Sequence, residues 1–456
     1  MRNISKNTRG DFGVRQDLIY LIIFVIASVS LFAKFYVDKH LALDGVGYFV
    51  QILEKQDFAE VAWSRRFTEY LTEWPLVLAV RLGVTDLATL INVFAVGIYF
   101  PYLLSFVLCW WAVRDDNKSL LWFPLAGYIA FNILSDYDLI ADHHVMAVMT
   151  WPLLVILLKS RQLFWREGIV LWIVIIIYSR TYETAALTAA MLFPLAVVRL
   201  FRFRSQQEKI IIGISLILLI AVMSVAVVYI VYPRSFTNRG NFLDSIWVNK
   251  RNWEAVATCA SLGIFSLAWL ISGRWIRLKN FLFIFALTPI IYYMFLRFTS
   301  DYSMTAYISF SSRTLSGIVL PGLIVLAAIV VYTRREISRT GLTVFLLIFL
   351  TMTCFNLADL RNWMGVKQEF LKVVDSDERY IFIDETPLSL SHYRWSWNNS
   401  LLSLVWSGDC VRTIILNAPG DPQGPVNPRE RLVLTQYLQF DSYFKTLDPT
   451  IRVCNK

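Results

Sequence analysis

Groups suited to acid–base or phosphate chemistry lie in polar stretches between long apolar segments of this chain. A carboxylate acts as a general base when it reaches a hydroxyl proton directly or through one water. A guanidinium binds phosphate through two parallel hydrogen bonds and keeps its charge. The candidate residues of these kinds, with one neighbouring tyrosine, are Asp44, Asp136, Asp138, Asp142, His143, His144, Arg180, Tyr182, Glu183, Arg297 and Arg313.

The composition indicates that membrane-spanning helices position these residues. Of 456 residues, 57% are hydrophobic and only 17% are charged, whereas soluble globular chains carry about 45–50% apolar and 25% charged residues. The mean hydropathy is +0.53. These values exclude a disordered protein, a disulfide-framed secreted module and an ordinary soluble enzyme. The net charge of +9 does not indicate a nucleic-acid partner, because the sequence contains no folded basic domain.

About eleven segments satisfy the requirement of roughly 20 mostly apolar residues for a transmembrane helix, allowing for shorter spans inside a bundle. The first follows a basic stretch and has no small-residue cleavage site, so it predicts a retained helix. The predicted spans are 17–34, 87–112, 119–134, 145–158, 168–179, 184–198, 209–232, 255–272, 280–296, 315–332 and 341–357.

Loop charges predict a cytoplasmic amino terminus, because Lys and Arg accumulate in short cytoplasmic loops. Counting alternately from that terminus makes every inside loop short and basic. The inside residues are Arg114, Lys118, Lys159, Arg161, Arg166, Arg199, Arg202, Arg204, Lys209, Arg274, Arg277, Lys279, Arg334, Arg335 and Arg339. The compact loops favour a bacterial inner membrane, with the candidate site facing the periplasm, although an endoplasmic reticulum shares the basic cytoplasmic face.

The predicted fold class is mainly α: a polytopic transmembrane bundle in residues 1–357 with a small extracytoplasmic α/β domain in residues 358–456. The first outer loop, 35–86, contains an amphipathic stretch that begins at Asp44 and a second helix from Trp63 to Leu82, both predicted to lie in the membrane interface. Short β-like runs in the tail predict strands at Ile381–Ile383 and Val411–Leu416. No internal repeat is visible.

A water-filled cavity open to the outer side is the simplest account of the polar residues. Ionisable residues are scarce inside the spans, which disfavours an ion-coupled transporter. Segment 168–179 is only about 18 Å long as a helix, so Arg180 and Glu183 are expected below the outer surface. Polar groups at that depth are tolerated where they line a cavity.

Structural roles remain open for the same residues. Asp44 is suited to cap the helix that follows it, and Arg180 and Glu183 have the i, i+3 spacing of an internal ion pair. Asp136, Asp138 and Asp142 fit a solvated loop. His143 and His144 are adjacent and are expected to point in different directions on a helix. Arg313 fits a side chain that reaches toward the membrane surface.

The cysteines add one open alternative. Cys109, Cys259 and Cys354 fall in predicted spans and are expected to be packing residues. Cys410 and Cys454 both lie in the outer tail, where an oxidising compartment allows either a disulfide or two free thiols.

The layout resembles the GT-C superfamily of integral-membrane glycosyltransferases. The stretch Asp44-Gly45-Val46-Gly47-Tyr48-Phe49 after the first span, the two interfacial helices and the outer tail carry the resemblance. Members often have an adjacent acidic pair in the first loop, whereas here Asp44 is followed by Gly45. The resemblance implies transfer of a sugar from a polyprenyl-phosphate-linked donor to a lipid, glycan or protein acceptor on the outer side of the bilayer, with no nucleic acid involved.

The resemblance also implies roles for the candidate residues. Asp44 would be the general base, and Arg180, Arg313 and Arg297 would bind the donor phosphate. The remaining acids, the two histidines and Tyr182 would contact sugar hydroxyls or position the acceptor. No protein-bound metal is assigned, while a divalent cation such as Mg²⁺ or Mn²⁺ is compatible with this chemistry.

Other function classes predict different patterns. A lipid or polysaccharide flippase or transporter predicts charged residues on both sides of the midplane, whereas here they lie on one side. An O-antigen-type polymerase or ligase predicts dependence on arginines in a large late loop rather than on an acid in the first loop. A non-catalytic scaffold predicts that the substitution Asp44→Asn is silent.

Overall fold

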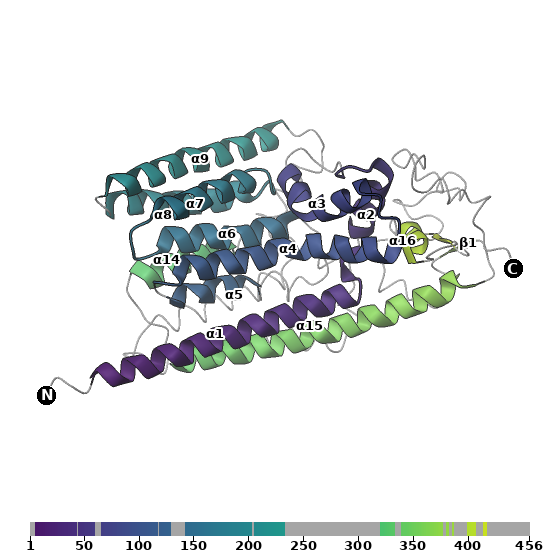
Figure 1. The fold of residues 1–456 in the computed structure, drawn as a ribbon, viewed down its shortest axis with the longest axis horizontal. Helices are drawn as coiled ribbons and strands as arrows, with labels where there is room; N and C mark the ends of the chain where they lie inside the picture. The colour runs from purple at the N-terminus through teal and green to yellow at the C-terminus, as the bar shows by residue number, and fades with distance from the viewer. Residues whose placement is uncertain are drawn as a thin grey trace.

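The structure is a computed structural model, and its described part is mainly helical (Figure 1). It describes residues 5–42, 44–59, 65–116, 118–128, 142–202, 205–232, 320–332, 339–376, 380–382, 385–386, 399–406 and 414–416. The predicted spans 255–272 and 280–296 lie outside the described residues. So do Asp136, Asp138, Arg297 and Arg313.

Each predicted span that the structure describes, in whole or in part, overlaps a helix. Their bounds are α1 (Ser5–Tyr36), η1 (Lys39–Leu41), α2 (Asp44–Lys55), α3 (Arg66–Arg81), α4 (Leu87–Val113), η3 (Lys118–Leu121), α5 (Trp122–Tyr128), α6 (Asp142–Leu158), α7 (Trp165–Tyr178), α8 (Ala185–Arg202), α9 (Gln206–Val231), α14 (Leu320–Tyr332), α15 (Arg339–Val374) and α16 (Asn399–Trp406).

Three of the described helices are long and apolar enough to cross a membrane: Leu87–Val113, Ala185–Arg202 and Gln206–Tyr229. Two shorter apolar helical stretches, Tyr20–Tyr36 and His143–Leu158, lie beside them. For the described residues, a mainly helical fold with long apolar helices is therefore confirmed, while the bundle of about eleven spans stays a prediction.

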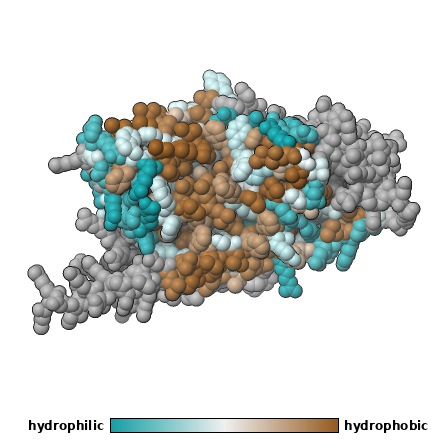
Figure 2. All heavy atoms as spheres, in the orientation of Figure 1, coloured by the Kyte–Doolittle hydropathy of each residue, from teal (hydrophilic) through white to brown (hydrophobic). Residues whose placement is uncertain are grey.

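Apolar side chains on the outward faces of the helices form the brown surface between hydrophilic ends in Figure 2. Such exposure is unfavourable in water but natural for side chains that face lipid acyl chains. It therefore agrees with a membrane environment. Examples with at least half of their area exposed are Leu18, Leu21, Val25, Val29, Phe32, Val96, Val107, Ile169, Ile173, Ile217, Val227 and Val228.

The connecting loops gather at two opposite ends of the bundle (Figure 1). At one end, Asp116 accepts hydrogen bonds from the backbone N–H groups of Ser160 and Arg161 at 2.7 and 3.1 Å, which joins the segments after α4 and α6. At the other end, the N–H of Phe67 donates to the carbonyl of Arg180 at 3.1 Å. The loop charges predict that the first set lies on the cytoplasmic side and the second on the outer side, and we name the two ends the inner and outer ends after this prediction.

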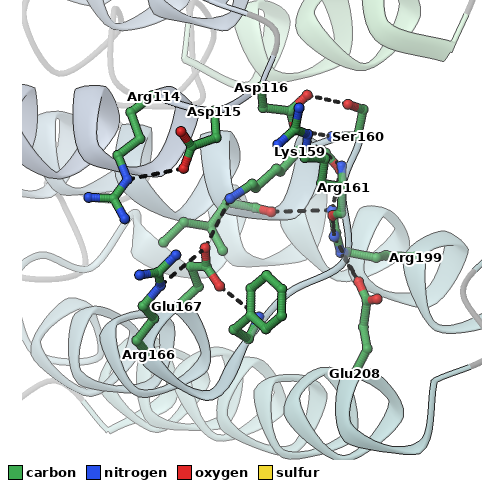
Figure 3. Close-up of polar contacts among 12 residues, drawn as sticks. Arg114, Asp115, Asp116, Lys159, Ser160, Arg161, Arg166, Glu167, Arg199 and Glu208 are labelled. Atoms are coloured by element: carbon green, nitrogen blue, oxygen red, sulfur yellow. Dashed lines mark hydrogen bonds and ion pairs between the residues drawn. The ribbon is translucent and has the colours of Figure 1, made fainter.

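A buried arginine closes the inner end (Figure 3). Arg199, in the last turn of α8, is 2% exposed and forms an ion pair with Glu208 of α9 at 2.7 Å. Its guanidinium also donates to the carbonyls of Leu157, Lys159 and Arg161. The last carbonyls of a helix have no partner within that helix, so Arg199 caps α6 from a neighbouring helix. From the sequence, Arg199 was expected only as a basic residue of an inside loop.

Helices α3 and α4 form a hairpin whose tip is at Gly83, with φ of 80°. Asp86 begins α4 by accepting a hydrogen bond from the N–H of Thr89 at 2.8 Å. Farther from the tip the helices meet at Gly97, where a Cβ atom would lie 2.0 Å from the carbonyl oxygen of Thr72. Only glycine permits this close approach, so α3 packs against the outer half of α4.

Helix α15 continues through residue 358, where the sequence analysis began the tail. Its 36 residues correspond to about 54 Å, more than a hydrocarbon core of about 30 Å requires. Beyond it, β1 (Tyr380–Phe382) and β2 (Ile414–Leu416) pair in parallel with α16 between them in sequence. The two strands overlap the predicted ones. Of the remaining tail, the structure describes only residues 358–376, 385–386 and 399–406.

The cysteine predictions are confirmed in one case and wrong in another. Cys109 is fully buried in α4, as expected of a packing residue. Cys354 is exposed on α15, because an apolar residue in a membrane helix faces lipid as readily as protein and hydropathy does not tell the two faces apart. Cys259, Cys410 and Cys454 lie outside the described residues.

The contact at Gly97 gives a stability prediction. Substitution Gly97→Ala places a methyl group against the Thr72 carbonyl and should destabilise the α3–α4 hairpin by about 1–3 kcal/mol. The thermal unfolding midpoint in mild detergent should fall accordingly. The matched control is Gly213→Ala on α9, where a Cβ meets nothing within 4 Å. Equal midpoints for the two variants would contradict the close packing.

Candidate functional site

The sequence-predicted residues that the structure describes lie at the outer end. Asp44 is the first residue of α2 and Asp142 is the first residue of α6. His143 and His144 follow in α6, and Arg180, Tyr182 and Glu183 belong to the turn that joins α7 to α8. We call residues 179–184 the α7–α8 turn.

The α7–α8 turn is bonded to the start of α3. The guanidinium of Arg65 forms two hydrogen bonds with the carboxylate of Glu183, both at 3.2 Å. The hydroxyl of Thr68 donates to the carbonyl of Thr181 at 3.0 Å. Side-chain exposure is 13% for Arg65 and 1% for Glu183, so this ion pair is largely removed from solvent. The first outer loop and the α7–α8 turn therefore form one structural unit.

Glu183 thus has a different partner from the one that local spacing suggested. The sequence left open an ion pair between Arg180 and Glu183, three residues apart. Instead, Glu183 binds Arg65, which is 118 residues away in the chain. The guanidinium of Arg180 lies over the ring of Phe67, 5.5 Å from its centroid. Arg65 and Arg180 consequently place two cations around the same end of α3.

Helix lengths place the α7–α8 turn below the outer end of α9. Gly168 of α7 lies against Ile211 of α9, so close that a Cβ atom would be 2.8 Å from the Ile211 side chain. From this level, ten residues remain to the end of α7 at Tyr178, whereas twenty remain to the end of α9 at Val231. The difference is about 15 Å at 1.5 Å per residue. The recessed position expected of Arg180 and Glu183 agrees with this difference.

Four planar groups, tilted relative to one another, form a continuous row of contacts beside the Glu183 ion pair. The guanidinium carbon of Arg65 lies 4.7 Å from the centroid of the Tyr182 ring. The Tyr182 ring is 5.5 Å from that of His143, which is 4.3 Å from the ring of His144. Both histidines and Tyr182 are at most 3% exposed. The expectation that the two histidines point apart is therefore wrong, because the rings of adjacent residues meet at the beginning of α6.

Arg65 is not among the site residues predicted from the sequence, although it lies in a predicted interfacial segment. The helix that follows turns its polar side inward, and Thr68, Glu69, Thr72 and Glu73 are all buried. Tyr70, Trp74, Leu78 and Leu82 are exposed on the other side. The sequence signal for this burial is the recurrence of polar residues at i, i+1, i+4 and i+5 opposite an apolar stripe. In water the apolar stripe would face the protein core, whereas beside lipid the polar side faces the protein.

The corner between α1 and α2 is fixed by several contacts around Asp38. Asp38 has a left-handed backbone with φ of 55°, which is uncommon for a residue other than glycine. Its carboxylate forms an ion pair with Lys367 of α15. The indole N–H of Trp363 donates to the carbonyl of Val37 at 2.9 Å. Helix α15 therefore holds the corner from which the chain enters α2 at Asp44.

His40 occupies the same corner without a charge. It is fully buried, and its ring is within 6.5 Å of the rings of Phe35, Phe94 and Tyr99. Burial lowers the pKa of His40 to about 3, so the imidazole is neutral at physiological pH. This histidine therefore packs as an aromatic residue and supports the start of α2.

Among the described residues, no group of three or more His, Cys, Asp or Glu side chains could hold a metal ion. The divalent cation compatible with the resemblance consequently has no ligand set in that part of the chain. Comparisons of the chain with protein-family models, curated proteins and solved structures found no match. The residues and contacts of the outer end are therefore the basis for assigning a function.

The Arg65–Glu183 ion pair gives a second prediction. Arg65→Met leaves the Glu183 carboxylate buried without this partner and should cost about 3–5 kcal/mol of stability. The control is Arg81→Met, since Arg81 and Asp57 form an ion pair at 2.9 Å in which both side chains are more than half exposed, and such pairs contribute little. Thermal midpoints in detergent compare the two. Similar losses of stability in the two variants would contradict a larger contribution from the buried Arg65–Glu183 pair.

Glu54 of α2 gives a pH prediction. Burial raises the pKa of this carboxyl to about 7, although Lys55 opposes the shift. A raised pKa means that the folded state favours the protonated acid, so its contribution is complete below the unfolded pKa and is lost as pH rises through about 7. The thermal midpoint should therefore fall from pH 5 to pH 8 and fall less in Glu54→Gln. Exposed Glu369 on α15 provides the control Glu369→Gln, which should follow the wild-type slope.

Proposed function

We propose that this protein is a membrane glycosyltransferase of the GT-C type, which transfers a sugar from a polyprenyl-phosphate donor at the outer side of the membrane. The observation that carries the proposal is the recessed polar unit built from the α3 start and the α7–α8 turn. It lies at the end of the bundle where α2 begins with Asp44 (Figure 1). A lipid-linked substrate requires polar chemistry at this depth beside an apolar surface.

Each part of this unit has a role in the proposed reaction. Asp44 removes the proton from the acceptor hydroxyl, which requires direct reach or one bridging water. Arg180 binds the donor phosphate and stabilises its charge as the sugar leaves. Arg65 adds a second cation nearby, and Glu183 keeps its guanidinium in one orientation. Fixed cations of this kind stabilise developing charge without reorganising during the reaction.

The aromatic and histidine residues are suited to the sugar and the acceptor. Tyr182 and His143 combine planar rings with polar edges and lie buried beside the Arg65–Glu183 ion pair, and Asp142 begins the helix that carries His143. Asp136 and Asp138 precede it in sequence, and Arg297 and Arg313 remain further phosphate candidates. The acceptor is a lipid, a glycan or a protein. A bacterial inner membrane, with the site facing the periplasm, is the proposed location.

The test uses purified protein in nanodiscs with a panel of polyprenyl-phosphate sugars. Wild-type protein should transfer sugar to an acceptor, and Asp44→Asn should lower turnover by about 10²–10⁴-fold while the unfolding midpoint is retained. Asp57→Asn, an exposed acid of the same outer loop, is the control and should keep wild-type turnover.

The outcomes separate the alternatives. Undiminished transfer by Asp44→Asn removes that residue from the role of base. No transfer from any donor, together with movement of labelled lipid-linked glycan across vesicles, would favour a flippase. Polymerisation or ligation of lipid-linked glycans that survives Asp44→Asn would favour an O-antigen-type enzyme.

A further inference from the structure

The inner end carries an exposed basic and aromatic surface that the proposed sugar transfer does not use. We call this surface the inner collar; it is formed by Arg161 and Phe164 of the connection between α6 and α7 and by Trp165 and Arg166 at the start of α7. All four side chains are exposed, and Phe164, Trp165 and Arg166 each expose about half of their area. The guanidinium of Arg166 lies 5.9 Å from the centroid of the Phe164 ring.

The carboxylates near the inner collar are already engaged in holding the loops together (Figure 3). Asp116 accepts hydrogen bonds from the backbone of Ser160 and Arg161. Glu167 is 2% exposed and accepts hydrogen bonds from the Lys159 ammonium at 2.9 Å and from the Phe164 N–H at 2.6 Å. The Nε of Arg166 is 3.9 Å from Glu167, farther than a hydrogen bond. The carboxylates of Asp116 and Glu167 are thus occupied by contacts of the loops, whereas the side chains of Arg161 and Arg166 are exposed.

An apolar stripe leads from the inner collar along α7. Trp165, Ile169, Ile173 and Ile176 recur at helical spacing, and each exposes about half of its area. Neighbouring Trp172 is fixed by donating its indole N–H to the Ile211 carbonyl at 3.1 Å. The surface therefore presents cations at the end of the bundle, aromatic rings next to them, and an apolar face that continues toward the middle of the membrane.

We propose that the inner collar and the α7 stripe bind one anionic phospholipid of the cytoplasmic leaflet. Its phosphate lies against Arg166, Arg161 adds positive charge at the same end of the bundle, its glycerol region lies beside Phe164 and Trp165, and an acyl chain follows the α7 stripe. The order of charged, aromatic and apolar groups matches the order of groups in such a lipid. Arg161 is suited to this role because its backbone, not its side chain, makes the loop contacts with Asp116 and Arg199.

Detergent-purified full-length protein tests the proposal by titration with dioleoyl phosphatidylglycerol or dioleoyl phosphatidylcholine. Bound lipids are counted by native mass spectrometry, and the unfolding midpoint is followed in parallel. We expect one phosphatidylglycerol to bind more tightly than phosphatidylcholine and to raise the midpoint more. The double variant Arg161→Gln/Arg166→Gln should lose this preference, with affinity for phosphatidylglycerol reduced on the order of tenfold or more.

Matched variants distinguish a lipid site from general attraction to positive charge. Arg81→Gln removes a cation that is as exposed as Arg166 but lies at the outer end, and it should keep the preference. Ile173→Ser on the stripe should weaken phosphatidylglycerol and phosphatidylcholine alike. Equal binding of both lipids by wild type, an unchanged preference in the double variant, or equal stabilisation by glycerol phosphate without acyl chains would overturn the proposal.

Discussion

A charge inside an apolar slab requires a partner, and the arrangement of this bundle follows from that requirement. Ion pairs between separate chain segments close both ends: Arg65 with Glu183 at the outer end, and Arg199 with Glu208 at the inner end. Removing either partner leaves a buried charge, which is far more costly than losing an exposed pair. These pairs therefore fix which helix ends lie together, while the apolar side chains fill the space between them.

The two ends use their polar groups differently. At the inner end, Arg199 binds backbone carbonyls at the end of α6 and the carboxylate of Glu208 in the first turn of α9, and Lys159 binds Glu167 in the first turn of α7. The hydrogen bonds of both cations therefore join helix ends. At the outer end, Arg65 also lies over the ring of Tyr182, and the row of contacting rings continues to His143. Aromatic and imidazole groups are not needed to satisfy a helix terminus. Among the described residues, the buried histidines lie at the outer end, and this is the reason to place the proposed chemistry there.

The sequence predicted the outer elements better than their contacts. Hydropathy located α2, the short α7 and the α7–α8 turn, because apolar length and charge position are local properties of a chain. It did not identify Arg65 as the partner of Glu183, since a pair separated by 118 residues depends on how α3 folds back on α4. The contact between the rings of His143 and His144 was not predicted either. The residue pattern does not contain the backbone geometry at the helix start that brings these adjacent rings together.

The position of Asp44 depends on contacts that come from the far end of the chain. Asp38 adopts an unfavourable backbone conformation, and strain of this kind persists only when surrounding structure over-determines it. Here Lys367 and Trp363 of α15 supply that structure, while buried His40 fills the space beneath the corner. The role proposed for Asp44 requires a carboxylate that stays within hydrogen-bonding reach of its proton. An α2 start fixed by α1, α4 and α15 together meets this requirement better than a loop attached to one helix alone.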